Sequence, residues 1–293
     1  MNKIKMTFKI MIILFISLLL YSALVEPNRL IVRKYDLDSS GKFLSDKSES
    51  NKRDDSKLNN KSNKNIKIIH ITDTQIGYFY SIKKLSKVVE KVNSLDGDIV
   101  VFTGDLIDRS NKNPNVEEIT KILSGIHSNK GKFAAFGNHD YVGKLPKYYR
   151  QIMKDSGFRL LVNDSEKLDL SFEKSINIIG ADEILSGNFD IEELKSKVSK
   201  EDFNLLLMHE PDLIDRFNQD SIELTLSGHS HGGQVGIPIK GALIGPPYGR
   251  KYTKGFYDIN GNNLYVSSGL GSTRIPFRLF NPPEIIEFNI NLN

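Results

Sequence analysis

The stretch DIVVFTGDLID at residues 98–108 joins an apolar run to a short acidic cluster. Successive apolar residues are typical of a strand that is buried on both faces of a parallel sheet. The run ends at Gly104, and Asp105 and Asp108 follow directly. Open α/β sheets bind their ligands at the carboxyl ends of such strands. The stretch therefore predicts an α/β fold with a polar site at one end of the sheet.

The same arrangement occurs at four other places in the chain, where an apolar run leads into a cluster of polar side chains. These clusters are Asp73-Thr74-Gln75, Gly137-Asn138-His139-Asp140, Met208-His209-Glu210 and Gly228-His229-Ser230-His231. Because the carboxyl ends of the strands meet in one crevice, five segments are expected to deliver ligands to one place. Oxygen and imidazole ligands suit Mn, Fe or Zn, and a closely spaced metal pair needs a bridging carboxylate.

Periodicity along the rest of the chain supports an α/β order. Apolar residues recur at helical spacing over 82–95, and residues 115–126 and 146–155 have the same pattern. Strands are predicted at 66–72, 98–103, 132–136, 176–180, 203–208, 222–226, 264–267 and 284–290. The last two follow a segment rich in Gly and Pro, and they indicate a second sheet.

Composition limits the class of protein. With 39% hydrophobic residues, 26% charged residues and no cysteine, the chain can bury a core, but it can form no disulfide or thiolate metal site. The net charge of +4 is unevenly distributed. Basic residues predominate in residues 1–65, whereas acidic residues slightly outnumber basic ones from Ile66 onward. No nucleic-acid partner is therefore expected.

The N-terminus has three lysines before an uncharged, apolar run over residues 10–25. As a helix this run would be about 24 Å long, slightly shorter than the ~30 Å hydrocarbon core of a membrane. A cleaved signal peptide and an uncleaved anchor are both compatible with it. Bulky residues at Tyr21 and Leu24 disfavour cleavage, so we expect a retained anchor and a single-pass protein of the cell membrane. The basic start favours an extracytoplasmic catalytic domain.

Three regions are accordingly expected. Residues 1–27 form the membrane anchor, and residues 28–65 form a polar, flexible linker that is almost without apolar side chains from Asp38 onward. Residues 66–293 form the catalytic domain.

In the order D-x-Q, GDLID, GNHD, H and GHSH, the five clusters resemble the calcineurin-like metallophosphoesterases over residues 66–293. The resemblance implies two mixed β-sheets sandwiched between helices, and hydrolysis of a phosphate ester or pyrophosphate bond at two divalent metals. It implies that Asp105 bridges the metals and that His139 faces the phosphate, with Asp140 orienting its ring. The implied ligands are Asp73, Gln75, Asp105 and His231 for metal one, and Asp105, Asn138, His209 and His229 for metal two.

One ligand departs from the usual family pattern, because Gln75 stands where His is common. An amide oxygen is a harder donor than imidazole, which favours manganese, with iron and zinc as alternatives. The segments GHSHGGQV, SSGLGSTRIPFR and Pro282-Pro283-Glu284-Ile285 look like the bacterial membrane-associated subgroup that includes UDP-2,3-diacylglucosamine pyrophosphatases. The resemblance implies a phosphorylated small-molecule or lipid substrate, acted on by a monomer.

Two other functions remain open from sequence: a nucleotide phosphodiesterase or nuclease, and a non-catalytic metal-binding scaffold. Three arginines, Arg109, Arg274 and Arg278, are candidates for gripping a substrate phosphate. Asp108 is either a cap or a support for the metal site, and Glu183 and Glu210 have no expected role.

Overall fold

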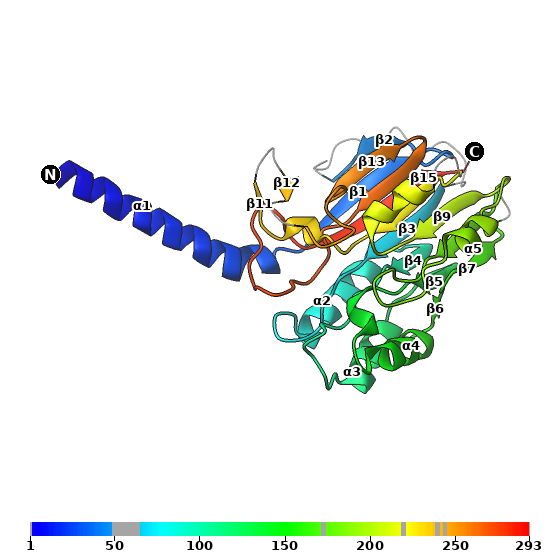
Figure 1. Cartoon of the computed structure of the whole chain (residues 1–293), viewed down its shortest axis with the longest axis horizontal. Coiled ribbons are helices and arrows are strands. Elements are labelled where there is room, and N and C mark those ends of the chain that lie inside the picture. Colours follow the sequence, from blue (N-terminus) through cyan, green and yellow to red (C-terminus); the bar gives the residue numbers. More distant parts are fainter. Residues whose placement is uncertain are drawn as a thin grey trace.

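The computed structural model describes residues 2–48, 65–170, 174–217, 221–237, 241–242 and 245–292. Two mixed β-sheets form the body of the protein, and helices pack on their outer faces (Figure 1). An apolar helix, α1 (Asn2–Leu20), projects from this body. The expected fold class, two mixed sheets between helices preceded by one apolar helix, is confirmed.

The first sheet has seven strands in the order β2-β1-β15-β3-β4-β5-β6. Its strands β3 to β6 are parallel, and β15 pairs antiparallel with β3 and parallel with β1. The bounds are β1 (Ile31–Leu37), β2 (Phe43–Asp46), β3 (Asn65–Ile71), β4 (Ile99–Phe102), β5 (Gly131–Ala134), β6 (Phe158–Leu160) and β15 (Glu284–Asn291).

The second sheet has six strands in the order β13-β14-β10-β9-β8-β7, of which β14, β10, β9 and β8 are parallel. The bounds are β7 (Asp164–Leu168), β8 (Ile176–Gly180), β9 (Phe203–Leu207), β10 (Leu224–Ser227), β13 (Gly255–Ile259) and β14 (Asn262–Val266). Two short strands, β11 (Gly236–Ile237) and β12 (Gly241–Ala242), pair separately.

Successive residues of the central strands face different layers, which explains why their sequences are continuously apolar. Ile68 and Val101 lie in the core between the sheets, whereas Ile69 and Val100 pack under the helices of the first sheet. Those helices are α2 (Ile82–Asn93), α3 (Val116–Ser124) and α4 (Leu145–Asp155). The second sheet packs on α5 (Ile191–Ser196) and the 3-10 helix Pro211–Arg216.

The structure corrects the expected linker over residues 28–65. Within it, β1 pairs with β15 along its whole length, and the side chains of Tyr35 and Leu37 are buried between the sheets. The folded body therefore begins near Ile31 and not at Ile66. The strand IVRKYDL contains three charged residues, and its partner comes from the far end of the chain, a pairing that local composition does not reveal. Residues 49–64 of the expected linker lie outside the described residues.

This correction predicts that a fragment starting at Ile66 is poorly stable. It loses two buried side chains, each worth about 1.5–3 kcal/mol, and exposes the edge of β15. Thermal unfolding of residues 66–293 should occur well below that of residues 21–293, and the shorter fragment should aggregate. Equal melting temperatures for the two fragments would contradict the structural role of β1.

Candidate metal centre

Five loops bring the seven expected metal ligands together at the carboxyl ends of the parallel strands. Asp73 and Gln75 follow β3, Asp105 follows β4, and Asn138 follows β5. His209 follows β9, and His229 and His231 follow β10. Asp73, Gln75, Asp105, His209, His229 and His231 are buried.

Short distances connect these side chains. His209 Nε2 is 3.4 Å from Asp105 Oδ2 and 3.9 Å from Asp73 Oδ1, and His231 Nε2 is 3.4 Å from Asp73 Oδ1. The Gln75 amide contacts Asp105 at 2.6 Å, and His229 Nδ1 is 2.9 Å from Asn138 Oδ1. The carboxylates of Asp73 and Asp105 and the ring of His209 offer ligand atoms within 4.8 Å of one another.

The backbone of these loops is held in an uncommon conformation. Asp73, Gln75, Asp105, His229 and His231 all have positive φ, between 50° and 66°. Residues with a Cβ seldom adopt the left-handed region, and each such residue costs about 1–3 kcal/mol unless its surroundings impose the conformation. The sheets hold the loops in place, and the left-handed turns aim the ligand side chains inward.

Glycines in the same loops allow their close approach. A Cβ at Gly137 would lie 2.3 Å from Asp105 Oδ1, and a Cβ at Gly228 would lie 2.0 Å from Asp73 Oδ2. Gly104 has a φ of +92° and stacks against the backbone of Gly137. The glycines of the GNHD and GHSH motifs therefore leave room for the carboxylates, and the glycine of the GDLID motif leaves room for the backbone of Gly137.

Hydrogen bonds outside the cluster orient two of the imidazoles. His209 Nδ1 lies 2.6 Å from the carbonyl of Thr103, and His229 Nε2 lies 2.8 Å from the carbonyl of Pro247. A carbonyl accepts only, so these nitrogens carry the protons. The opposite nitrogens, His209 Nε2 beside Asp105 and His229 Nδ1 beside Asn138, then have lone pairs available to a metal. This is how metal-binding histidines are held in other proteins.

The arrangement fits divalent cations. Gln75 Oε1, His209 Nε2 and His231 Nδ1 are buried without a hydrogen-bond partner. A buried lone pair without a donor is costly, and a cation would satisfy several at once. Burial and the nearby Asp105 raise the pKa of Asp73 to about 6, although His209 opposes them. Burial opposes protonation of His209, yet the carboxylates of Asp105 and Asp73 raise its pKa well above the usual value. A divalent cation bound here would balance the charge of the carboxylates of Asp73 and Asp105.

His139 lies beside this cluster. Its backbone N–H donates to Asp105 Oδ1 at 2.8 Å, and its ring Nδ1 lies 3.7 Å from Asp108 Oδ2 and 3.4 Å from the N–H of Arg109. The expected contact from Asp140 to this ring is wrong. The Asp140 carboxylate instead accepts the backbone N–H groups of Asp105, Leu106 and Gly137, at 2.7, 3.1 and 3.0 Å. Asp108 is the carboxylate next to the ring, and Asp140 ties two ligand loops together.

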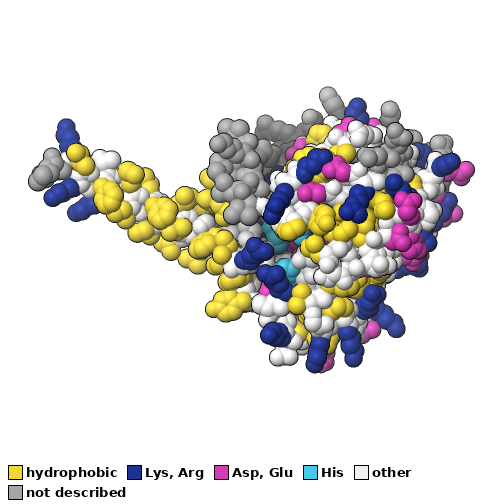
Figure 2. Space-filling model, viewed as in Figure 1, with side chains coloured by type: hydrophobic (Ala, Val, Ile, Leu, Met, Phe, Trp, Pro, Cys, Tyr) yellow, Lys and Arg dark blue, Asp and Glu magenta, His cyan; other side chains and the backbone are white. Residues whose placement is uncertain are grey.

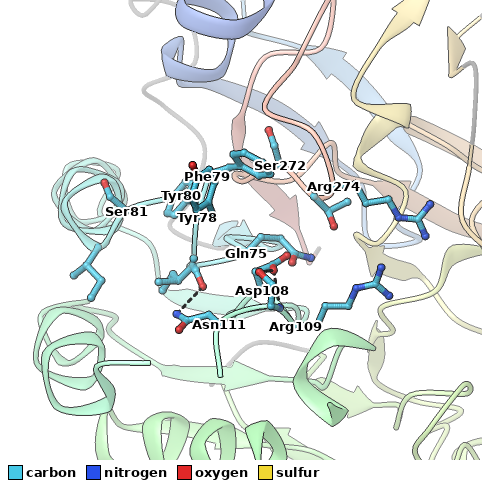
Figure 3. Close-up of a pocket in the computed structure, with 15 residues that line it drawn as sticks. Gln75, Tyr78, Phe79, Tyr80, Ser81, Asp108, Arg109, Asn111, Ser272 and Arg274 are labelled. Carbon is cyan, nitrogen blue, oxygen red and sulfur yellow. Dashed lines mark hydrogen bonds between the residues drawn. The ribbon is translucent and has the colours of Figure 1, made fainter. Parts of the chain in front are cut away.

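Two of the three candidate arginines line the cavity over this site. Arg109 and Arg274 extend into the same space beside Gln75 and Asp108 (Figure 3). The candidate role of Arg278 as a phosphate ligand is wrong, because the side chain is fully buried and donates to the carbonyls of residues 268, 269, 271 and 281. This arginine holds the loop before β15 in place.

Sequence reasoning gave no role to Glu210, but its buried carboxylate lies with His209 and His229 in a group of possible metal ligands. Burial and the neighbouring carboxylate of Glu183 raise the pKa of this carboxyl well above the usual value, although His209 opposes them. Its position directly after His209, at the end of a buried strand, was the signal that pointed to it.

The glycine packing gives a direct test. Gly228→Ala should push Asp73 out of place and lower metal content and phosphatase activity by at least about tenfold, the range seen when a ligand's surroundings are disturbed. The matched control is Gly125→Ala, because a Cβ there lies 3.1 Å from its nearest neighbour, a carbonyl of its own helix. Elemental analysis and circular dichroism of both variants would measure the effect. A Gly228→Ala protein with full metal content would contradict the packing argument.

Comparisons with known proteins agree with this geometry. Residues 66–233 match the model of the calcineurin-like phosphoesterase family. The chain is 35% identical over 224 residues to the uncharacterized metallophosphoesterase YkuE of Bacillus subtilis, which covers 76% of this chain and 78% of that protein. It is 26% identical over 276 residues to the UDP-2,3-diacylglucosamine pyrophosphatase LpxG of Chlamydia trachomatis, covering 75% of this chain and 82% of the other.

Among solved structures, a dimetal phosphatase from Danio rerio is similar, with 12% identity and a TM-score of 0.44 over 72% of this chain and 89% of that one. From the match to the family model and the similarity to YkuE, the chain belongs to the calcineurin-like phosphoesterase family, whose members are metal-dependent hydrolases of phosphoester bonds.

Proposed function

We propose that this protein uses two divalent metals to hydrolyse a phosphate ester or pyrophosphate bond on a lipid-linked or envelope-associated substrate. The observation that carries the proposal is the position of Asp105, whose carboxylate contacts both the Gln75 amide and His209. Metal one would be held by Asp73, Gln75, Asp105 and His231, and metal two by Asp105, Asn138, His209 and His229.

Two bound metals would polarise the phosphoryl oxygens and lower the pKa of water to supply the nucleophile. The protein's own contribution is to hold the seven ligands rigidly and to exclude competing donors. Its buried strands and left-handed turns fix the ligands before any metal arrives, so little reorganisation is needed on binding. The amide of Gln75 is a neutral oxygen donor, which favours manganese over zinc at metal one.

His139 is the proposed catalytic residue. The ring lies at the edge of the metal ligands and lines the cavity that Arg109 and Arg274 also line. We assign it to the phosphate, as acid for the leaving group or as a stabiliser of developing charge. Asp108, 3.7 Å from Nδ1, and the N–H of Arg109, 3.4 Å from the same nitrogen, would orient the ring. Asp140 acts more remotely, by holding the loops that carry Asp105 and Asn138.

The proposed location is the cell membrane, with α1 as an uncleaved single-pass anchor and the catalytic domain on the extracytoplasmic side. The helix over Lys3–Asn28 has a mean hydropathy of 2.4 and is almost entirely unburied, so by length and composition it can cross a membrane. The exposed apolar side chains along α1 are evident in Figure 2. The similarity to LpxG, named as a UDP-2,3-diacylglucosamine pyrophosphatase, supports the proposed lipid-linked substrate.

Replacement of His139 tests whether the protein is an enzyme or a non-catalytic metal-binding scaffold. His139→Asn should lower kcat by at least about 100-fold on a substrate with a poor leaving group, because the interaction with the leaving oxygen strengthens as charge develops. Asp108→Asn should lower it by about 10–100-fold, because the ring is then less well held.

Steady-state kinetics would be measured beside metal content, which should stay at the wild-type level in both variants. An activated aryl phosphate needs less proton donation, so its loss should be smaller if His139 is an acid. Unchanged turnover with full metal content would remove His139 from the mechanism.

A further inference from the structure

Two helical turns that follow α1, a π-helical turn (Tyr21–Val25) and a 3-10 turn (Glu26–Asn28), fix α1 to the catalytic domain. The carbonyl of Ser22 accepts the N–H of Arg278 at 2.9 Å, and the carboxylate of Glu26 accepts the N–H of Asn281, also at 2.9 Å. Glu26 is only 2% exposed. Ile31 then enters β1 directly, with its N–H donating to the carbonyl of Pro283 at 3.0 Å. The direction of the helix therefore sets the direction in which the domain faces.

An aromatic loop lies beside this docked helix end. Ala23 and Pro27 share a small cavity with Phe79, Tyr80 and Lys84. The neighbouring Tyr78 is 90% exposed and packs only edge-on against Phe79, at 5.1 Å between ring centroids. An unpacked tyrosine next to the base of an apolar helix is the arrangement found where proteins meet the lipid headgroups. We define the aromatic loop as residues 78–80.

The two chain segments on the aromatic loop's side of the cavity carry basic and no acidic side chains, whereas Asp108 lines the cavity elsewhere. No acidic residue occurs in residues 74–89 or in residues 268–283, although the sequence from Ile66 onward is slightly acidic as a whole. The first segment instead carries exposed lysines at Lys83 and Lys87, and Arg29 is exposed at the end of the apolar helix. Lys87 shares a second small cavity with Pro27 and Asn28. Such a surface is complementary to anionic lipid headgroups, which attract each nearby Lys or Arg.

The aromatic loop also lines a cavity that adjoins the one over the metal centre, because Arg109, Thr273 and Arg274 line both. Tyr78, Phe79 and Tyr80 line one side of a space of about 780 Å³, and Gln75, Asp108 and Arg109 line another. Figure 3 places the aromatic side chains and the arginines around this same cavity. A loop that touched the bilayer would therefore hold the mouth of the cavity at the headgroup level.

We propose that the aromatic loop and Lys83 and Lys87 form a second contact with an anionic bilayer, next to α1. The two contacts hold the cavity against the membrane surface, so that the site receives a phosphate carried on a lipid of the same leaflet. This inference rests on the proposed membrane anchor, and it specifies how the substrate reaches the site.

The absence of native cysteine allows a single-site test in the full-length protein. Tyr78→Cys, labelled with an environment-sensitive fluorophore, would be reconstituted in nanodiscs of phosphatidylcholine and phosphatidylglycerol with a spin-labelled quencher lipid. We expect quenching at position 78 at least twice that at Lys130→Cys, an exposed control before β5 at the opposite end of the sheet. Phe15→Cys, within α1, reports on the anchor itself.

If position 15 is quenched but position 78 is quenched no more than position 130, the second contact is overturned and the anchor remains. No quenching at position 15 would remove the anchor and this inference together. Lys83→Glu with Lys87→Glu should reduce quenching at position 78, whereas the same reversal at Lys121 and Lys154 should not. An unchanged signal in the first pair would overturn the electrostatic part of the contact.

Discussion

The structure depends on the cluster of buried polar and charged groups around Asp105. Its backbone and carboxylate connect the loops after β3, β4 and β5: the amide of Gln75 and the N–H of His139 contact the carboxylate, and Asp140 accepts its N–H. His209 approaches from the second sheet. Bringing such groups together in a dry interior is costly unless a cation balances them. The two-sheet sandwich supplies the buried framework that holds these groups together.

The backbone of the loops around Asp105 is also shaped by the close packing of these groups. Five of the proposed ligand residues adopt left-handed conformations, and glycines occupy positions where a side chain would displace a carboxylate. These features lower the stability of the metal-free chain, so they persist because the packed strands on either side over-determine them. A function that needs the ligands fixed before the metal binds accounts for both, whereas a binding scaffold without chemistry would have no need of His139 beside the cluster.

Much of the site could be predicted from the sequence, because each ligand directly follows a buried strand whose apolar run is visible locally. The central strands and helices α2, α3 and α4 were predicted for the same reason. What was missed depends on distant partners. β1 is a strand only because β15 lies beside it, and Arg278 is structural only because four carbonyls surround it. Asp140 follows His139 in sequence, yet the turn directs its carboxylate to the backbone of Asp105, so adjacency in sequence misassigned its role.

The central claim is that one carboxylate, Asp105, joins two metals. Electron paramagnetic resonance of the manganese-loaded protein, with elemental analysis of the same sample, tests it most directly. The account predicts two manganese ions per chain and the multiline spectrum of an exchange-coupled pair, which Asp105→Asn abolishes. One manganese per chain with the simple six-line spectrum of an isolated ion would contradict it.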